Sequence, residues 1–298
     1  MRPHHLAALS FPLLFACEHG HEDEPEGPVE IHFEARVADQ PFACGQSYTG
    51  LGSDGATVTP QDFRFYVYDV HLITVDGAEY PVTLTDDGKF QGGGVALLDF
   101  EDGSGACTNG TPETHTTLKG AIGPMPRHGG SHGFAGIRFT IGVPPDLNHA
   151  DPTLLPAPLN DTTLSWTWNF GHIFLAAWGE FGSGDQAYPL GIHLGSTGCT
   201  GDAMAGETVT CTRSNRPEIA LAGFDPESST VVVDWAALFA DLALTSPPAE
   251  CGQSEDGETT CACHTMHPEA LCRTLMTPLG LDWQSGESSA MQSLFRVL

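Results

Sequence analysis

Histidine, cysteine and tryptophan are the residue types of this chain that could do chemistry. Its 298 residues include 14 histidines, nine cysteines and five tryptophans. Imidazole and sulfur are the ligands that soft and borderline transition-metal ions prefer. An imidazole must be neutral to bind such an ion, so affinity should fall as the pH drops through the range where histidine takes up a proton. These residue types are therefore the candidate ligands to consider for a metal site.

The chain has no enzyme motif in a sequence context that would support catalysis. The chain has no zinc-binding His-Glu-x-x-His, no phosphate-binding P-loop, no dinucleotide-binding glycine fingerprint, and no nucleophile elbow between a strand and a helix. We assign no catalytic residue and expect a protein that is not an enzyme.

His193 is the first candidate metal ligand. It ends a predicted strand over residues 188–194 and precedes a Gly-Ser-Thr-Gly turn that closes at Cys199. A turn anchored by a cystine would hold the imidazole rigidly, as a ligand requires. The alternative is a strand-end histidine that only makes hydrogen bonds.

His149 and His172 are the other candidates. Asp151 could orient the His149 ring by a hydrogen bond, as acidic residues behind metal ligands commonly do. An Asx-type turn would explain Asn148 and Asp151 without a metal. His172 follows Gly171, which could instead only mark a bulge.

The N-terminus predicts export. A short basic start and an apolar run lead to Leu14-Phe-Ala-Cys17, which resembles a bacterial lipobox in which Cys17 is lipidated. An ordinary cleaved signal is the alternative. The apolar run is too short to span a bilayer. We expect a protein that is lipid-anchored in the periplasm or at the outer membrane or cell surface.

With Cys17 assigned to lipid, eight cysteines remain, and an exported chain is expected to pair them. Eight cysteines allow about 105 pairings, so connectivity is not derivable from the sequence. The neighbours in the chain are Cys199 with Cys211, Cys251 with Cys261 and Cys263 with Cys272, which leaves Cys44 and Cys107. If reduced, the run from Cys261 to His267 would be a competing soft-metal site.

The charge balance excludes one class of partner. Lysine and arginine total 11 against 38 acidic residues, a formal charge of −27. Nucleic acids and anionic membrane surfaces would repel such a chain, so we expect no nucleic-acid partner and membrane contact only through a lipid anchor. The acidic clusters at residues 86–87 and 99–102 are interpreted as solvated surface.

The elements that must position these residues are predominantly strands. Residues 29–37 alternate strictly between apolar and polar side chains, and residues 62–74 form the longest strand signal. Residues 164–174 are predicted as a strand that projects Trp166 and Trp168 from one face, with Trp178, Trp235 and Trp283 as packing residues. The fold class is all-β: a β-sandwich-like domain with long disulfide-pinned loops and a small helical, Cys-rich C-terminal appendage.

The chain divides into four segments on this interpretation. Residues 1–17 are a lipoprotein signal and residues 18–28 an acidic, disordered tether. Residues 29–245 are the β domain, and residues 246–298 are a Cys-rich extension packed on the same domain. A helix is expected from Asp234, which is a suitable N-cap, and a short one near residues 268–275.

Several motifs occur together in an order that resembles one family. They are Phe63-Arg-Phe-Tyr-Val-Tyr-Asp-Val-His-Leu-Ile73, Leu97-Leu-Asp-Phe-Glu101, Gly136-Ile-Arg-Phe-Thr-Ile-Gly-Val-Pro144, Leu147-Asn-His149, Pro158-Leu-Asn160, Trp166-Thr-Trp168, His193-Leu-Gly-Ser-Thr-Gly-Cys199 and Asn215-Arg216. The chain resembles the MbnP-like family, also called metallo-mystery-pair four-Cys proteins, over roughly residues 29–298. One departure is Asn169, where the family commonly has glutamine.

The resemblance implies a copper-binding protein with a di-haem partner of the cytochrome c peroxidase type. In such pairs the partner oxidises a tryptophan to kynurenine, which helps to form a Cu(I) site with histidines. Carried to this chain, it implies Trp166 or Trp168 as the modified residue and His149, His172 and His193 as ligands that converge on one ion. The alternatives are a metal-free surface lipoprotein with a structural or adhesion role, and a redox protein in which tryptophan oxidation is itself the purpose.

Overall fold

The structure is a computed structural model that describes residues 27–108, 110–123, 133–166, 170–182, 187–253, 259–265, 269–289 and 291–298. The predicted lipidation site Cys17 and one of the paired tryptophans, Trp168, lie outside the described residues.

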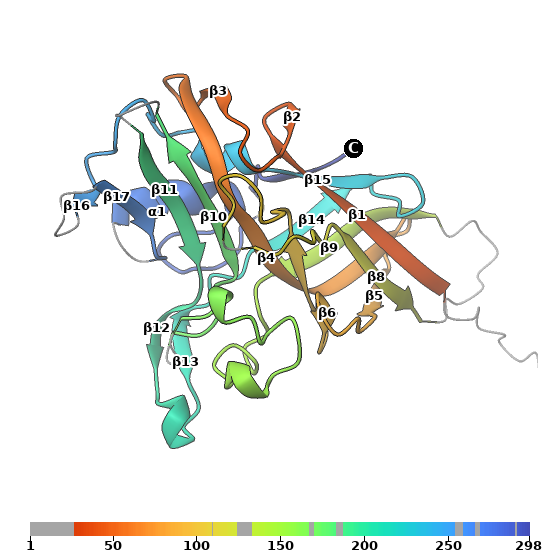
Figure 1. Ribbon diagram of the computed structural model, residues 1–298. Helices are drawn as coiled ribbons and strands as arrows, with labels where there is room; N and C mark the ends of the chain where they lie inside the picture. Colours follow the sequence, from red (N-terminus) through yellow and green to blue (C-terminus); the bar gives the residue numbers. More distant parts are fainter. Residues whose placement is uncertain are drawn as a thin grey trace, which may run out of the picture.

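Strands dominate the fold, as the sequence predicts (Figure 1). They are β1 (Gly27–Val37), β2 (Gln40–Pro41), β3 (Tyr48–Leu51), β4 (Ala56–Thr74), β5 (Glu79–Leu84), β6 (Gln91–Gly92), β7 (Val95–Asp99), β8 (Thr117–Ile122), β9 (Phe134–Ile141), β10 (Leu175–Phe181), β11 (Tyr188–Leu194), β12 (Thr197–Thr200), β13 (Thr210–Arg213), β14 (Glu218–Ala222), β15 (Thr230–Asp234), β16 (Gly252–Gln253), β17 (Thr259–Cys263) and β18 (Phe295–Val297). The helices are α1 (Glu269–Met276) and the 3₁₀ turns η1 (Pro152–Leu154), η2 (Thr162–Leu164), η4 (Ala203–Ala205), η5 (Trp235–Phe239) and η6 (Thr277–Leu279).

Strand β4 is the centre of the sheet. It pairs with β10 along its first half and with β9 along its second, and β5 carries the hydrogen-bonded path onward to β8, β1, β15 and β18. Strand β4 is irregular at Asp69, which has a positive φ of 52° where the pairing with β9 shifts. The sheet therefore curls into two facing layers.

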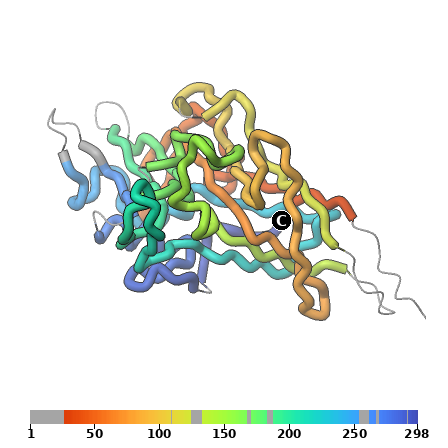
Figure 2. Tube along the Cα trace, turned by 90° about the horizontal axis from the view of Figure 1, so that it is seen from below, coloured from red at the N-terminus to blue at the C-terminus, as the bar shows by residue number. Residues whose placement is uncertain are grey.

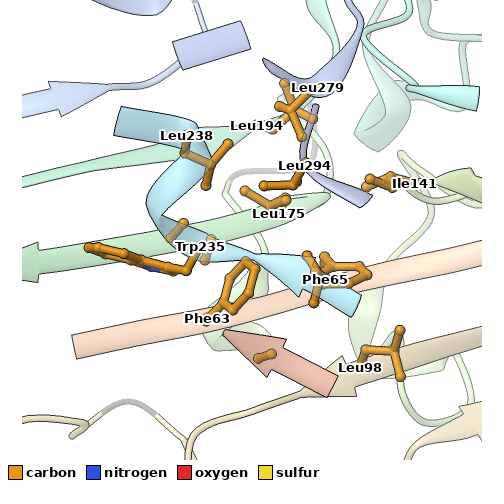
Figure 3. Packing of buried hydrophobic residues seen from close by; sticks show 14 of the residues in the cluster. Phe63, Phe65, Leu98, Ile141, Leu175, Leu194, Trp235, Leu238, Leu279 and Leu294 are labelled. Carbon is orange, nitrogen blue, oxygen red and sulfur yellow. The ribbon is translucent and has the colours of Figure 1, made fainter. Parts of the chain in front are cut away.

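The core fills the space between these layers (Figure 3). Phe33 of β1 lies 5.6 Å, ring centroid to centroid, from Phe139 of β9, and Phe65 of β4 lies 5.8 Å from Phe295 of β18. Apolar burial of this kind is the main favourable term in folding. The sandwich-like, all-β fold class is confirmed.

The alternation of β1 is confirmed residue by residue. Its apolar positions, from Val29 to Val37, are at most 9% exposed, while His32 points to solvent and bonds Thr117. The period of two is the one expected for a strand with one buried face.

The strand predicted over residues 164–174 is wrong for its described residues, which form only an isolated bridge between Ser165 and His172. Asp161 caps the turn η2 by accepting a hydrogen bond from Thr163 N, and Trp166 N donates to Gly171 O. Gly171 has a φ of 77° because its backbone packs against Asn148, too close for a Cβ. The regular strand, β10, begins only at Leu175.

All eight cysteines form disulfides, in the pairs that chain neighbourhood suggested: Cys44–Cys107, Cys199–Cys211, Cys251–Cys261 and Cys263–Cys272. The pair Cys199–Cys211 joins β12 to β13, a separate hairpin that projects from the body in Figure 1. In Figure 2 this hairpin (teal) lies beside the loop that precedes η1 and η2 (green). The cysteines from Cys261 to Cys272 are therefore not thiolate ligands here.

The C-terminal part packs on the same body. Strand β17 pairs parallel with β11, and β18 pairs antiparallel with β15. The helix expected from Asp234 is the 3₁₀ turn η5, which Asp234 caps as predicted. The second expected helix is α1. Among the described residues, no helix is long and apolar enough to cross a membrane.

Candidate metal centre

One face of β11 is built to receive large side chains. Gly191, His193 and Gly195 alternate along it. A Cβ at Gly191 would lie 2.5 Å from the Trp178 indole, and one at Gly195 would lie 2.5 Å from the Trp166 indole. The two glycines thus admit two tryptophans, and His193 stands between them.

A second imidazole reaches this face from the C-terminal part. The parallel register of β11 and β17 pairs Ile192 with Cys263, so His264 follows beside His193. Their ring centroids are 5.2 Å apart. The Thr265 hydroxyl donates to His193 O and accepts from Gly195 N, at 2.8 and 2.9 Å, which fixes this segment to β11.

The hydrogen bonds of His193 define its tautomer. Trp178 Nε1 donates to His193 Nε2 at 2.6 Å, so Nε2 is an acceptor and the proton of the neutral ring lies on Nδ1. Nδ1 is buried and has no hydrogen-bond partner among the described residues. Buried polar atoms are rarely left in this state.

The electrostatic environment keeps this ring neutral. Burial, together with the charges of His264 and Arg64, lowers the pKa of His193 to about 3. Neutral imidazole is the form that binds a metal. The expectation that protons compete for the site near neutrality is therefore not supported for His193, because its proton uptake lies at much lower pH.

Two adjacent imidazoles fit a soft or borderline ion such as a d¹⁰ cation, which accepts few ligands. His193 is partly shielded and His264 is exposed, so the centre is open on one side. Trp166 lies 6.5 Å from His193, measured between ring centroids. The arrangement joins two metal donors to two electron-rich aromatic rings.

Two comparisons with known proteins bear on this centre. A sequence model of the MbnP family matches residues 26–253. This chain belongs to the MbnP family. The structure is similar to MbnP from Methylosinus trichosporium, with a TM-score of 0.76, 26% sequence identity, and coverage of 91% of this chain and 98% of that one. No curated protein sequence matches.

MbnP proteins are associated with metal binding, and the His193 centre brings two imidazoles together. The family match ends at residue 253, so His264 lies beyond it. The second imidazole therefore lies outside the residues that the sequence model matches.

The three histidines expected to converge do not do so. Among the described residues, the cluster of three or more His, Cys, Asp or Glu donor atoms within 4.8 Å of one another contains His149, Cys199 and Cys211, and neither His172 nor His193. His172 is fully buried, with its ring nitrogens 3.0 Å from the carbonyl oxygens of Asn148 and Leu159. Through these contacts His172 links the loop that contains Asn148 to the loop that contains Leu159.

Trp178 was expected to be only a packing residue; it does pack over Gly191, but it also belongs to the His193 centre. It is the hydrogen-bond donor to His193 and lies 6.3 Å from the His264 ring. The pattern Gly191-x-His193-x-Gly195 could have signalled it, because glycines that alternate on one strand face leave room for large neighbours. Trp235 and Trp283 do pack, on Phe239 and Arg213.

Asp99 and Glu101 are buried, which corrects their interpretation as solvated surface, whereas Asp86, Asp87 and Asp102 are exposed as expected. Arg64 pairs with Asp62 and Glu101, both at 2.8 Å, and lies 3.6 Å from Asp161. Burial raises the pKa of Asp99 to about 7, and burial with the negative charge of Asp62 raises that of Glu101. One guanidinium thus compensates several carboxylates inside the protein.

Proposed function

We propose that this chain is an exported copper-binding protein that holds one Cu(I) ion through His193 and His264. The observation that carries the proposal is the His193 ring, neutral, with a buried Nδ1 that has no partner among the described residues, 5.2 Å from a second imidazole. Cu(I) accepts imidazole ligands at low coordination number. Membership of a family associated with metal binding supports it further.

The same proposal gives the tryptophans a redox role. The family resemblance implies a di-haem partner that oxidises one tryptophan to kynurenine and so completes the Cu(I) site. Trp166 is the candidate that the geometry favours, since its indole lies against the backbone of Gly195 and 6.5 Å from His193. The chain itself catalyses nothing on this view. Its residues bind and orient the ion.

Export and lipid anchoring through Cys17 complete the proposal. Four disulfides are typical of an oxidising compartment, which supports a periplasmic or cell-surface location. The formal charge of −27 favours a basic partner surface.

The test is the copper content of protein exported with and without a di-haem partner. We expect one copper per chain after co-expression, and a loss of Cu(I) affinity of about tenfold or more in His193→Gln and in His264→Gln. His32→Gln is the matched control, because His32 is exposed on β1 and remote from this centre in sequence.

Three results would count against parts of this proposal. Protein without stoichiometric copper in either expression would favour the metal-free surface role. Full affinity in His264→Gln would exclude His264 as a ligand. An intact mass that lacks the gain of one oxygen and loss of one carbon would exclude kynurenine.

A further inference from the structure

The cluster of His149, Cys199 and Cys211 lies outside the His193 centre. His149 Nε2 is 3.3 Å from Cys211 Sγ, and the donor atoms of the three residues all lie within 4.8 Å of one another. In the structure the two sulfurs form a disulfide, which has no thiolate to offer a metal. Reduction would change the donor set without requiring the three residues to come together from elsewhere.

Asn148 orients the imidazole toward these sulfurs. Its Oδ1 accepts from His172 N at 3.0 Å, which fixes the amide so that Nδ2 faces His149 Nε2, also at 3.0 Å. The amide donates, so Nε2 is the nitrogen with the lone pair. The same nitrogen is the one beside Cys211, and a lone pair is what a metal ligand must present.

This disulfide is the most accessible of the four. Cys199 and Cys211 are both partly exposed, whereas every other disulfide contains at least one fully buried cysteine: Cys107, Cys261, or Cys263 with Cys272. Thiol–disulfide exchange needs direct approach of the attacking thiolate to a sulfur. Both sulfurs of Cys199–Cys211 are therefore open to attack by a dithiol, whereas the other pairs offer one partly exposed cysteine or none.

The hairpin can also open without breaching the core. Strands β12 and β13 form a two-stranded sheet separate from the main one, and they project from the body in Figure 1. Gly198 lets the turn of β12 approach the Thr212 side chain. The main apolar core contains neither Cys199 nor Cys211.

We propose that reduction of Cys199–Cys211 by a dithiol creates a second site, for one soft d¹⁰ metal ion, from two thiolates and the His149 imidazole. The dithiol loses two electrons and two protons and becomes a disulfide, while Cys199 and Cys211 become thiols. Metal binding then releases the two thiol protons to solvent. Two sulfurs and one imidazole are a donor set that soft ions favour, with a fourth position open.

The test uses Cd²⁺ alone as the probe, since a cadmium thiolate has an ultraviolet charge-transfer band that imidazole ligation lacks. The full chain is treated with a limited amount of a dithiol, and differential alkylation with peptide mapping identifies the reduced cysteines. We expect Cys199 and Cys211 to be labelled before the other pairs. The band should rise to one Cd²⁺ per chain in reduced protein and be absent in oxidised protein.

Variants test whether His149 is a ligand separately from whether the disulfide is reduced. His149→Gln should weaken Cd²⁺ binding by about tenfold or more while two thiols are still counted, and His32→Gln should leave it unchanged. His193→Gln should also leave the cadmium-thiolate band unchanged, which makes this inference independent of the copper proposal. Preferential reduction of another pair, no thiolate band after reduction of Cys199–Cys211, or full affinity in His149→Gln would each overturn it.

Discussion

Trp178→Phe should increase Cu(I) affinity, because the indole N–H competes with the ion for His193. If the ion binds Nε2, it must displace the Trp178 Nε1 donor that now lies 2.6 Å away. If it binds Nδ1, the ring proton must move to Nε2 and would face that same N–H. Either route loses the hydrogen bond, so the direction does not depend on which nitrogen binds.

The magnitude follows from the net value of that bond. A hydrogen bond contributes about 0.5–1.5 kcal/mol net, and about 1.4 kcal/mol is a factor of ten in affinity. The Trp178→Phe variant should therefore bind Cu(I) about 2- to 12-fold more tightly than the wild-type protein. The ring remains to fill the space over Gly191, where Trp178 now packs.

The assay is competition for Cu(I) against a chromogenic chelator, with ¹⁵N NMR of the apo protein as a second readout. In wild type the His193 nitrogens should report a proton on Nδ1, and in Trp178→Phe this preference should weaken. Trp283→Phe is the matched control, since Trp283 packs on Arg213. Unchanged or weaker Cu(I) binding in Trp178→Phe, with a folded protein, would refute the reasoning.

Three further predictions follow from packing and charge. Gly195→Ala should lower the free energy of unfolding by about 1–3 kcal/mol and weaken Cu(I) binding, because the methyl group would overlap the Trp166 indole; a chemical denaturation curve matching wild type would contradict this. Arg64→Met should destabilise by about 3–5 kcal/mol, since it leaves buried carboxylates uncompensated, and urea denaturation measures it. Stability should fall as the pH rises from about 4 to about 7, because folded Asp99 keeps its proton over that range while the unfolded chain has already lost its own, and Glu101 acts in the same direction. Asp99→Asn should flatten that dependence in thermal melts, and an unaltered slope would exclude Asp99 as its source.

The parts of the fold that the sequence predicts are those set by local pattern. The alternation in β1 and the Asp234 cap depend on near neighbours, and both occur as expected. The Trp-x-Trp pattern was misleading: it predicts a strand, but the described residues around it form the capped turn η2 and an isolated bridge between Ser165 and His172. Sequence periodicity does not record which of these two structures forms.

Of the two imidazoles of the candidate centre, the sequence predicts only one, because the other is positioned by a contact between distant parts of the chain. His193 could be chosen from its turn, but its partner His264 depends on a parallel pairing between β11 and β17. Nothing near His193 in the sequence encodes that pairing. Similarly, the burial of Asp99 and Glu101 follows from how the sheet encloses Arg64, which an acidic run alone does not reveal.

The parallel pairing of β11 with β17 has a kinetic consequence. The antiparallel pair β10–β11 can form early, since its strands are neighbours in the chain, and it already places Trp178 on His193. His264 is 71 positions beyond His193 (264 − 193) and joins only when a long loop has closed, which loop entropy makes slow. It also follows Cys263, whose disulfide with Cys272 needs an oxidant. On the proposed function, a nascent or still reduced chain would lack the complete two-imidazole centre, and metal capture would wait for export and oxidation.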